Sequence, residues 1–260
     1  MRNSCVCGAV LMLALIACPA GALVIIDDFQ NPVISPPSPV KIWLEQYIVG
    51  VGDTYANPGF NAGLPLASTI GGRRDFALQY IGGGSIGAES QLSIIGFPDQ
   101  NLQFSNDAGV MATFWIGYGM AVPLDWDTTA PATFSDTIEL VIRSTDHDSQ
   151  FIAHLASGVG TLGEVHEVVI YSLPSGFTGP FVIPLSDFPN IDVTDIDQIG
   201  FIFGFETAVL PGDDELQPTY VADLQLSVDV IRATGAIPEP TTLALLGLGA
   251  LALARKRRRA

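Results

Sequence analysis

The sequence predicts an all-β protein whose main part is a two-sheet antiparallel sandwich of jelly-roll type. Two segments carry the clearest signal. Large residues alternate with Gly200, Ile202 and Gly204 along residues 199–205, and apolar residues alternate with polar ones along residues 222–230. A period of two residues is typical of a strand that buries one face. The predicted buried faces are Ile199, Phe201, Phe203 and Phe205 in the first segment and Leu224, Leu226, Val228 and Val230 in the second.

Helical periodicity is missing from residues 23–236, and the whole chain holds 27 Gly and 18 Pro, which suit many turns. Runs of β-branched and aromatic residues predict the other strands. They cover residues 23–29, 41–49, 76–81, 91–95, 110–118, 137–143, 151–156, 165–171 and 177–185. About ten strands at this spacing favour one sandwich domain.

Two strand pairings are predicted from adjacency in the chain. The strands at 137–143 and 151–156 are expected to form a hairpin, and those at 165–171 and 177–185 the next pair. Residues 50–72 are rich in Gly, Asn and Pro and are expected to form a long irregular connection.

The predicted domain is strongly acidic. Residues 23–236 contain 26 Asp and Glu but only five Lys and Arg, a net charge of −21. Nucleic acid is excluded as a partner, because a protein that reads nucleic acid presents a basic surface. Two interpretations of the acidity stay open: a solvated surface that keeps the domain soluble, and clustered carboxylates that bind calcium.

The N-terminus has the pattern of a Sec signal peptide. Arg2 precedes an apolar run at residues 9–17, and small residues follow up to Ala22. Cleavage after Ala22 would make Leu23 the first residue of the mature protein. A second interpretation stays open, because residues 15–18 resemble a lipoprotein lipobox, in which Cys18 is lipidated.

Cysteine is confined to the predicted signal peptide, at Cys5, Cys7 and Cys18. After cleavage at Ala22 the mature protein would therefore have no disulfide, no cysteine nucleophile and no thiolate metal site. Such a domain must be stabilised by burial, and about 210 residues are sufficient for a hydrophobic core.

Three features follow one another at the end of the chain. Pro238, Glu239 and Pro240 form a turn that stops a helix from running back into the preceding domain. Residues 241–254 form an uncharged apolar helix, and the basic cluster behind it is Arg255, Lys256, Arg257, Arg258 and Arg259. A helix of this length spans roughly 21 Å, against about 30 Å of hydrocarbon, so a buried core helix is the alternative. Long basic side chains can extend a short span, which favours a single transmembrane helix with the cations in the cytoplasm.

This order of turn, apolar helix and basic cluster closely resembles the PEP-CTERM sorting signal of Gram-negative bacteria. The resemblance implies an exported protein that an exosortase, an integral-membrane transpeptidase-like enzyme, processes near Pro238, Glu239 and Pro240. It also implies transient anchoring in the inner membrane and delivery to the cell surface or extracellular matrix. The predicted organisation is a signal peptide (residues 1–22), an exported β-sandwich domain (23–236) and a sorting signal (237–260).

A second resemblance concerns the middle of the chain. Its motifs are IDDF at 26–29, GRRD at 72–75, DFPN at 187–190, DIDQIGF at 195–201 and VADLQLSVDVI at 221–231. Together they resemble galactose-binding-type jelly rolls. This resemblance implies that the first and last strands pair and that a calcium ion can bind nearby.

Two glycine motifs have a catalytic or nucleotide-binding interpretation. G-x-S-x-G at 83–87 would place Ser85 on a nucleophile elbow, but no helix is predicted after it. G-x-G-x-x-G at 158–163 would bind a dinucleotide only at the start of a helix, and a strand is predicted there. We therefore predict a turn at the first motif and a hairpin turn at the second.

Short acidic pairs in loops supply the candidate metal ligands. Calcium is the ion that they could bind, and turn formation by Asp side chains is the alternative. The four residues are Asp125, Asp127, Asp146 and Asp148.

Trp126, in a polar loop, is the candidate for stacking on a sugar ring. Trp115 lies among apolar neighbours and is expected in the core. His154 and His166 lie on predicted strands and are expected to be scaffold residues rather than ligands.

No coherent catalytic set is evident in the sequence, so the leading hypothesis is a non-enzymatic exported protein of the cell surface or extracellular matrix. A carbohydrate-binding module for exopolysaccharide is the alternative. A glycan-active enzyme is a third hypothesis, which would need two carboxylates facing one cleft. No cofactor other than calcium is expected.

Overall fold

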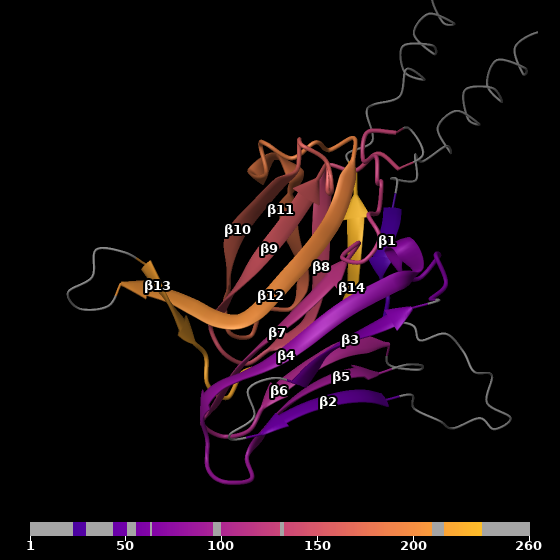
Figure 1. Ribbon diagram of the computed structural model, residues 1–260. Coiled ribbons are helices and arrows are strands. Elements are labelled where there is room, and N and C mark those ends of the chain that lie inside the picture. Colours follow the sequence, from indigo (N-terminus) through magenta and orange to yellow (C-terminus); the bar gives the residue numbers. More distant parts are fainter. Residues whose placement is uncertain are drawn as a thin grey trace, which may run out of the picture.

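Two antiparallel β-sheets packed face to face form the body of the protein, as Figure 1 shows. The computed structural model describes residues 23–29, 44–50, 56–62, 64–95, 100–130, 133–209 and 216–235. The predicted signal peptide and the predicted C-terminal transmembrane helix lie outside these ranges. Within the ranges, no helix has the length and apolar character needed to cross a membrane.

Sheet A has seven strands in the order β11-β8-β14-β6-β5-β2, with β1 also paired to β14. They are β1 (Leu23–Asp27), β2 (Leu44–Gly50), β5 (Glu89–Ile95), β6 (Asn101–Asn106), β8 (Thr137–Thr145), β11 (Gly179–Pro184) and β14 (Gln225–Thr234). β1 and β6 lie end to end along one side of β14, since β1 pairs with residues 231–234 and β6 with residues 225–228. The first and last strands therefore pair, which confirms the expectation from the jelly-roll resemblance.

Sheet B has seven strands in the order β10-β9-β12-β7-β4-β3, with β13 also paired to β12. They are β3 (Ala56–Ala62), β4 (Arg73–Gly83), β7 (Val110–Tyr118), β9 (Ser149–Ser157), β10 (Val165–Leu173), β12 (Ile196–Val209) and β13 (Leu216–Tyr220). β12 is the longest of these strands, and with β13 it projects from the body at the left of Figure 1.

The chain crosses repeatedly between the sheets, and these crossings correct two predicted pairings. β8 and β9 are adjacent in sequence but lie in different sheets, so residues 146–148 form a crossover rather than a hairpin turn. β10 and β11 are split between the sheets in the same way. The glycine motif at 158–163 does join the antiparallel strands β9 and β10, which confirms the predicted hairpin turn.

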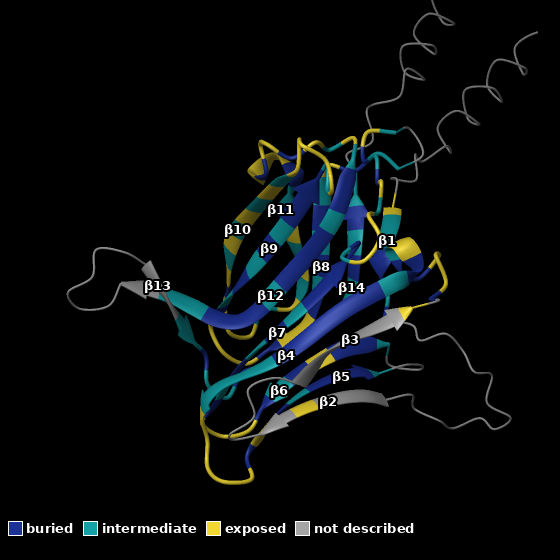
Figure 2. Cartoon of the chain, viewed as in Figure 1, coloured by how far each residue is buried: buried dark blue, intermediate teal, exposed yellow. Residues whose placement is uncertain are grey.

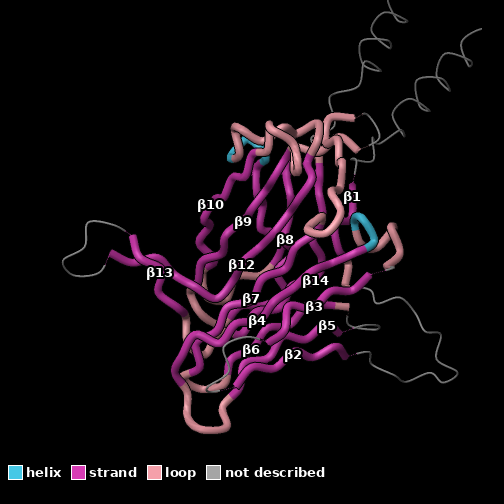
Figure 3. Tube along the Cα trace, viewed as in Figure 1, coloured by secondary structure: helices cyan, strands magenta, loops and turns pink. Residues whose placement is uncertain are grey.

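Three strands lie where the sequence pattern predicts none. β3 interrupts the connection expected at residues 50–72, and β6 and β13 are short strands that follow loops. Figure 3 also shows two short helical turns, η1 (Ile70–Gly72) and η2 (Leu185–Asp187). The strand pairs are all antiparallel among the described residues, which confirms the predicted all-β, two-sheet sandwich.

Aromatic rings at the centre of the core join the two sheets. Phe104 on β6 packs against Phe114 on β7, with ring centroids 4.7 Å apart. Phe114 stacks on Phe203 of β12 at 4.7 Å, and Phe203 stacks on Phe151 of β9 at 5.2 Å. All four rings are buried, as are most positions of β7 and β12 in Figure 2. The predicted buried face of residues 199–205 is therefore confirmed.

The last strand departs from its predicted alternation at one point. Leu224, Leu226 and Val228 are buried as predicted, but Val230 is half-buried and Ile231 takes its place in the core. The pairing of β14 with β8 shifts register between Val228 and Val230. An irregularity of this kind inserts a residue and exchanges the faces of the strand beyond it.

Candidate functional site

Trp115 lies on the outer face of sheet B, opposite to the expected position. Its neighbours Phe114 and Ile116 point into the core, and the Trp115 ring is half-buried on the other face of β7. A Cβ at Gly117 would collide with this ring, and one at Gly200 of β12 would lie 3.1 Å from Trp115 Nε1. The indole therefore lies along the surface of the sheet, over positions that carry no side chain.

A chain of hydrogen bonds runs beside this ring, from β9 to β10. His154 Nε2 lies 3.0 Å from His166 Nδ1, and His166 Nε2 lies 2.5 Å from Glu164 Oε1. Glu164 also accepts a hydrogen bond from the Gly160 N–H at 2.9 Å. The hydrogen bonds from His166 and Gly160 hold the pKa of Glu164 below its ordinary value, so this carboxylate is an acceptor.

The last nitrogen of this hydrogen-bond chain, His154 Nδ1, lies next to Gly200 of β12. Glu164 accepts a hydrogen bond from His166 Nε2, and His166 Nδ1 and His154 Nε2 share the next one, in which the tautomers determine the donor. Burial, and then the neighbouring His166, lower the pKa of His154 and favour its neutral form. His154 Nδ1 lies 3.6 Å from the position of a Cβ on Gly200, and a donor, Trp115 Nε1, lies 3.1 Å from the same position.

Three carboxylates come together where the loop after β7 meets the start of β12. One oxygen from each of Asp125, Asp195 and Asp197 lies within 4.8 Å of the others. Asp197 is only 3% exposed and accepts a hydrogen bond from the Val159 N–H at 2.6 Å. Desolvation, followed by repulsion from neighbouring Asp residues, raises the pKa of Asp195. This cluster is the place among the described residues where carboxylate oxygens could hold a divalent cation.

Calcium should therefore stabilise the protein through this cluster, because a bound cation removes the mutual repulsion of the three carboxylates. We expect millimolar calcium to raise the melting temperature of the wild-type protein more than that of the Asp195→Asn variant. Differential scanning calorimetry with and without a chelator measures the difference, and Asp148→Asn is a control outside the cluster. Equal shifts in the three proteins would show that the cluster binds no calcium.

The acidic residues singled out in the sequence do not form one site. Of the four, only Asp125 joins the cluster. Asp127 accepts hydrogen bonds from Thr129 and Ala130 in its own turn. Asp146 accepts from the Gln225 N–H and Asp148 from the Ser175 N–H, both at 2.7 Å. Asp127, Asp146 and Asp148 therefore stabilise turns and crossovers, which is the alternative to calcium binding.

Two tryptophans lie in positions opposite to those expected, since Trp126 is in the core and Trp115 is on the outer face of sheet B. Trp126 is 6% exposed and packs in the core, so its ring is not available to stack on a sugar. Its backbone forms a bridge with Ile196, which draws the polar loop against the sandwich. The two-residue period of the strand predicted at residues 110–118 could have placed Trp115 outside, since Phe114 and Ile116 occupy the inner face.

Ser85 lies in an exposed turn between β4 and β5. Its carbonyl accepts a hydrogen bond from the Ala88 N–H at 2.9 Å, and a strand follows, which confirms the predicted turn. A nucleophile elbow would need a helix at this place.

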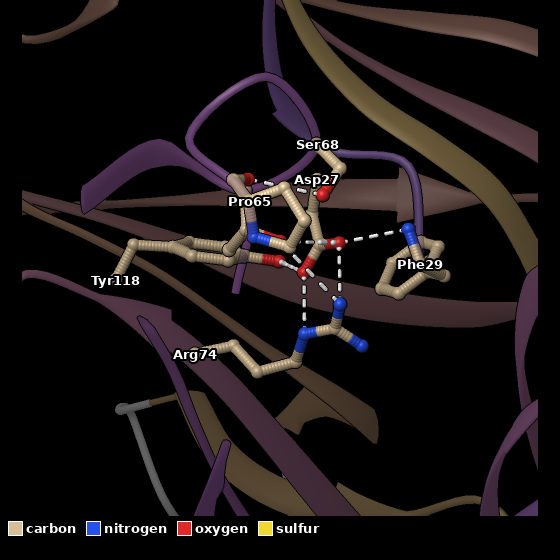
Figure 4. A network of polar contacts seen from close by, with 7 residues as sticks. Asp27, Phe29, Pro65, Ser68, Arg74 and Tyr118 are labelled. Atoms are coloured by element: carbon tan, nitrogen blue, oxygen red, sulfur yellow. Dashed lines mark hydrogen bonds and ion pairs between the residues drawn. The ribbon is translucent and has the colours of Figure 1, made fainter. Parts of the chain in front are cut away.

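A buried polar network joins the first strand to sheet B and is drawn in Figure 4. Asp27 and Arg74 are fully buried and contact each other twice, at 2.9 Å through Nε and at 3.0 Å through Nη2. The Tyr118 hydroxyl donates to Asp27 at 2.9 Å, and the Phe29 N–H donates at 2.8 Å. Burial raises the pKa of Asp27 to about 6, although Arg74 and both donors act against the rise. Because the network is closed to solvent, we assign it a structural role.

Comparison with known proteins locates one recognised motif in the chain. Residues 236–259 match the PEP-CTERM protein-sorting motif, which confirms the resemblance of the C-terminal segment. No match was found among curated proteins.

The chain is similar to two solved structures. One is a family 11 carbohydrate-binding module from Clostridium thermocellum in complex with a β-1,3-1,4-mixed-linked tetrasaccharide, with 14% identity and a TM-score of 0.32 over 74% of this chain and 96% of that one. The other is the family 11 module of the cellulosomal cellulase Lic26A-Cel5E of Clostridium thermocellum, with 15% identity and a TM-score of 0.35 over 84% of this chain and 96% of that one.

Proposed function

We propose that this chain is a non-enzymatic protein of the cell surface or extracellular matrix, which is sorted by an exosortase through residues 237–260. The observation that carries the proposal is the match of residues 236–259 to the PEP-CTERM sorting motif. The signal-peptide pattern at residues 1–22 supports it, because a C-terminal sorting signal acts only on an exported chain. The sandwich between these signals is the part delivered outside the cell.

The order of events follows from the chemistry of the segment. The apolar run at 241–254 holds the exported chain in the inner membrane, and the five cations behind it stop further transfer. The exosortase then processes the chain near Pro238, Glu239 and Pro240. The sandwich carries the net negative charge and stays in the aqueous phase.

Two variants separate anchoring from processing. Deletion of residues 238–260 should release the protein from the membrane fraction of its natural host, because no apolar segment remains at the C-terminus. Substitution of Pro238, Glu239 and Pro240 by Ala should instead leave unprocessed full-length protein in the membrane fraction. Fractionation and mass spectrometry of the C-terminus measure both effects. If the wild type and both variants fractionate identically, the proposal is wrong.

Carbohydrate binding is a second candidate function, and the surface position of Trp115 favours it. An indole that lies along a sheet offers a flat apolar face, which suits the apolar face of a pyranose ring. An extracellular polysaccharide is a ligand that a surface protein meets. Binding to a glycan array by the wild-type protein would support this function, and binding to no glycan would exclude it.

A further inference from the structure

Strand register places an apolar row across the outer face of sheet B. Ile170 on β10 pairs with Ile152 on β9, which pairs with Ile202 on β12, and Ile202 pairs with Trp115 on β7. Four neighbouring strands at about 4.8 Å spacing make this row roughly 14 Å long. Ile170 is 46% exposed, and the alternating bands of β10 in Figure 2 show that one side of this strand faces solvent.

Hydrogen-bonding groups lie on both sides of the apolar row. On one side, the paired positions Val168, His154, Gly200 and Gly117 form the next row. The Trp115 indole and the end of the Met120 side chain cover the two glycines, and His154 Nδ1 and Trp115 Nε1 both lie close to Gly200. On the other side lie Ser172 and Gln150, which pair on β10 and β9, and Gln79 and Thr113, which pair on β4 and β7.

The charge of the face restricts its ligand. Arg73 and Asp75, at the end of β4, form an ion pair with each other at 2.5 Å. Glu164 is engaged by His166 and Gly160. The domain as a whole is strongly acidic, so an anionic polymer is repelled. A neutral ligand with apolar faces and a rim of hydroxyl groups fits both the row and its polar borders.

We propose that the outer face of sheet B binds a neutral polysaccharide chain, with Trp115 as the stacking platform and His154 as a hydrogen-bond partner for a sugar hydroxyl. The proposal rests on the carbohydrate-binding function above and assigns it to a site. His166 and Glu164 are positioning residues, because their hydrogen bonds orient the His154 ring. A pyranose ring over the indole brings its hydroxyls to the edge of the ring near Gly200, where Trp115 Nε1 and His154 Nδ1 lie.

The test uses the full-length protein in mild detergent and affinity gel electrophoresis with dextran, galactomannan and hydroxyethyl cellulose, and with alginate as an acidic polymer. We expect retardation by a neutral polymer but not by alginate. Trp115→Ala and Ile170→Asp should each weaken binding about tenfold or more, because each removes apolar contact from the row. Val182→Asp is the matched control, since Val182 is 47% exposed on β11 of the other sheet.

His154 provides a test of the hydrogen-bond assignment. His154→Phe should weaken binding, whereas His154→Gln should retain much of it because the side-chain amide can still form a hydrogen bond with a sugar hydroxyl. Gly117→Ala should also weaken binding, since the new methyl group displaces the Trp115 ring. Near-ultraviolet circular dichroism and melting temperatures establish that each variant is folded.

The outcomes separate failure of the proposed site from failure of the carbohydrate-binding function. If the wild type binds a neutral polymer and Trp115→Ala, Ile170→Asp and Val182→Asp bind it equally well, the site is wrong and the carbohydrate function stands. If the wild type binds none of the polymers, both are wrong. Retardation by alginate alone would overturn the ligand class. If Ile170→Asp converts a dimer to a monomer without changing polysaccharide binding, the face belongs to a second copy of the chain.

Discussion

Replacement of Arg74 by Met is expected to lower the free energy of unfolding by about 3–5 kcal/mol, the usual cost of removing one partner from a buried ion pair. Asp27 would remain fully buried without its cation. The hydrogen bonds from Tyr118 and Phe29 cannot replace the lost charge, and burial already raises the pKa of Asp27 to about 6. Chemical denaturation at pH 7 measures the loss.

The chain offers a matched control one residue earlier. Arg73 pairs with the buried Asp75, but the Arg73 side chain is 32% exposed and solvent screens part of the interaction, so Arg73→Met should cost less than Arg74→Met. A double variant, Asp27→Leu with Arg74→Met, should be more stable than the sum of the two single losses predicts, since it leaves no buried charge behind. Equal losses for Arg73→Met and Arg74→Met would contradict the structural role of the network.

Replacement of Phe114 by Ala is expected to lower the free energy of unfolding by about 3–5 kcal/mol, as large-to-small changes of buried aromatic residues do. The Phe114 ring packs on Phe104 of sheet A and on Phe203 of its own sheet, each at 4.7 Å. Its loss leaves a cavity between the two layers that strands fixed by their hydrogen bonds cannot fill.

The next residue, Trp115, provides a direct comparison with Phe114. Trp115→Ala removes a larger ring from the same strand, but from the outer face, where the remaining surface stays hydrated. We expect Trp115→Ala to fold with a much smaller loss of stability and to lose polysaccharide binding, whereas Phe114→Ala should keep binding under conditions in which it is folded. Equal stability losses would show that both rings belong to the core.

The strands that the sequence predicts best are those that bury one complete face. Along residues 199–205 the large residues Ile199, Phe201, Phe203 and Phe205 recur at every second position, and all four are buried. The prediction for β14 holds until the register shift near Asp229, after which Ile231 and Ala233 face the core. A single inserted residue leaves the composition of the strand unchanged, so the period alone does not reveal it.

Pairing between strands was harder to predict than the strands themselves. β8 and β9 are separated by only three residues, a distance typical of hairpins, yet the chain crosses to the other sheet there. The crossover is held by Asp146 and Asp148, which bind backbone N–H groups of Gln225 and Ser175, far away in sequence. Contacts of this kind depend on the finished fold.

For the candidate sites, too, the sequence indicated the residue types but not which residues lie next to each other. Asp125 was found by its type and its loop position, but Asp195 and Asp197 join it only because the loop after β7 meets the start of β12. His154 and His166 were expected to be scaffold residues, and only the β9–β10 register brings their rings within 5.2 Å. Side-chain type indicated the chemistry, and pairing between distant strands decided which residues meet.

The position of β14 bears on the timing of secretion. This strand lies in the interior of sheet A, between β8 and the line formed by β1 and β6, and it ends at Thr234, just before the sorting motif. A polypeptide that emerges N-terminus first exposes this strand last. Sheet A therefore stays open along its middle until nearly the whole chain has been translocated. The sandwich therefore completes its folding at about the time when the sorting segment reaches the membrane.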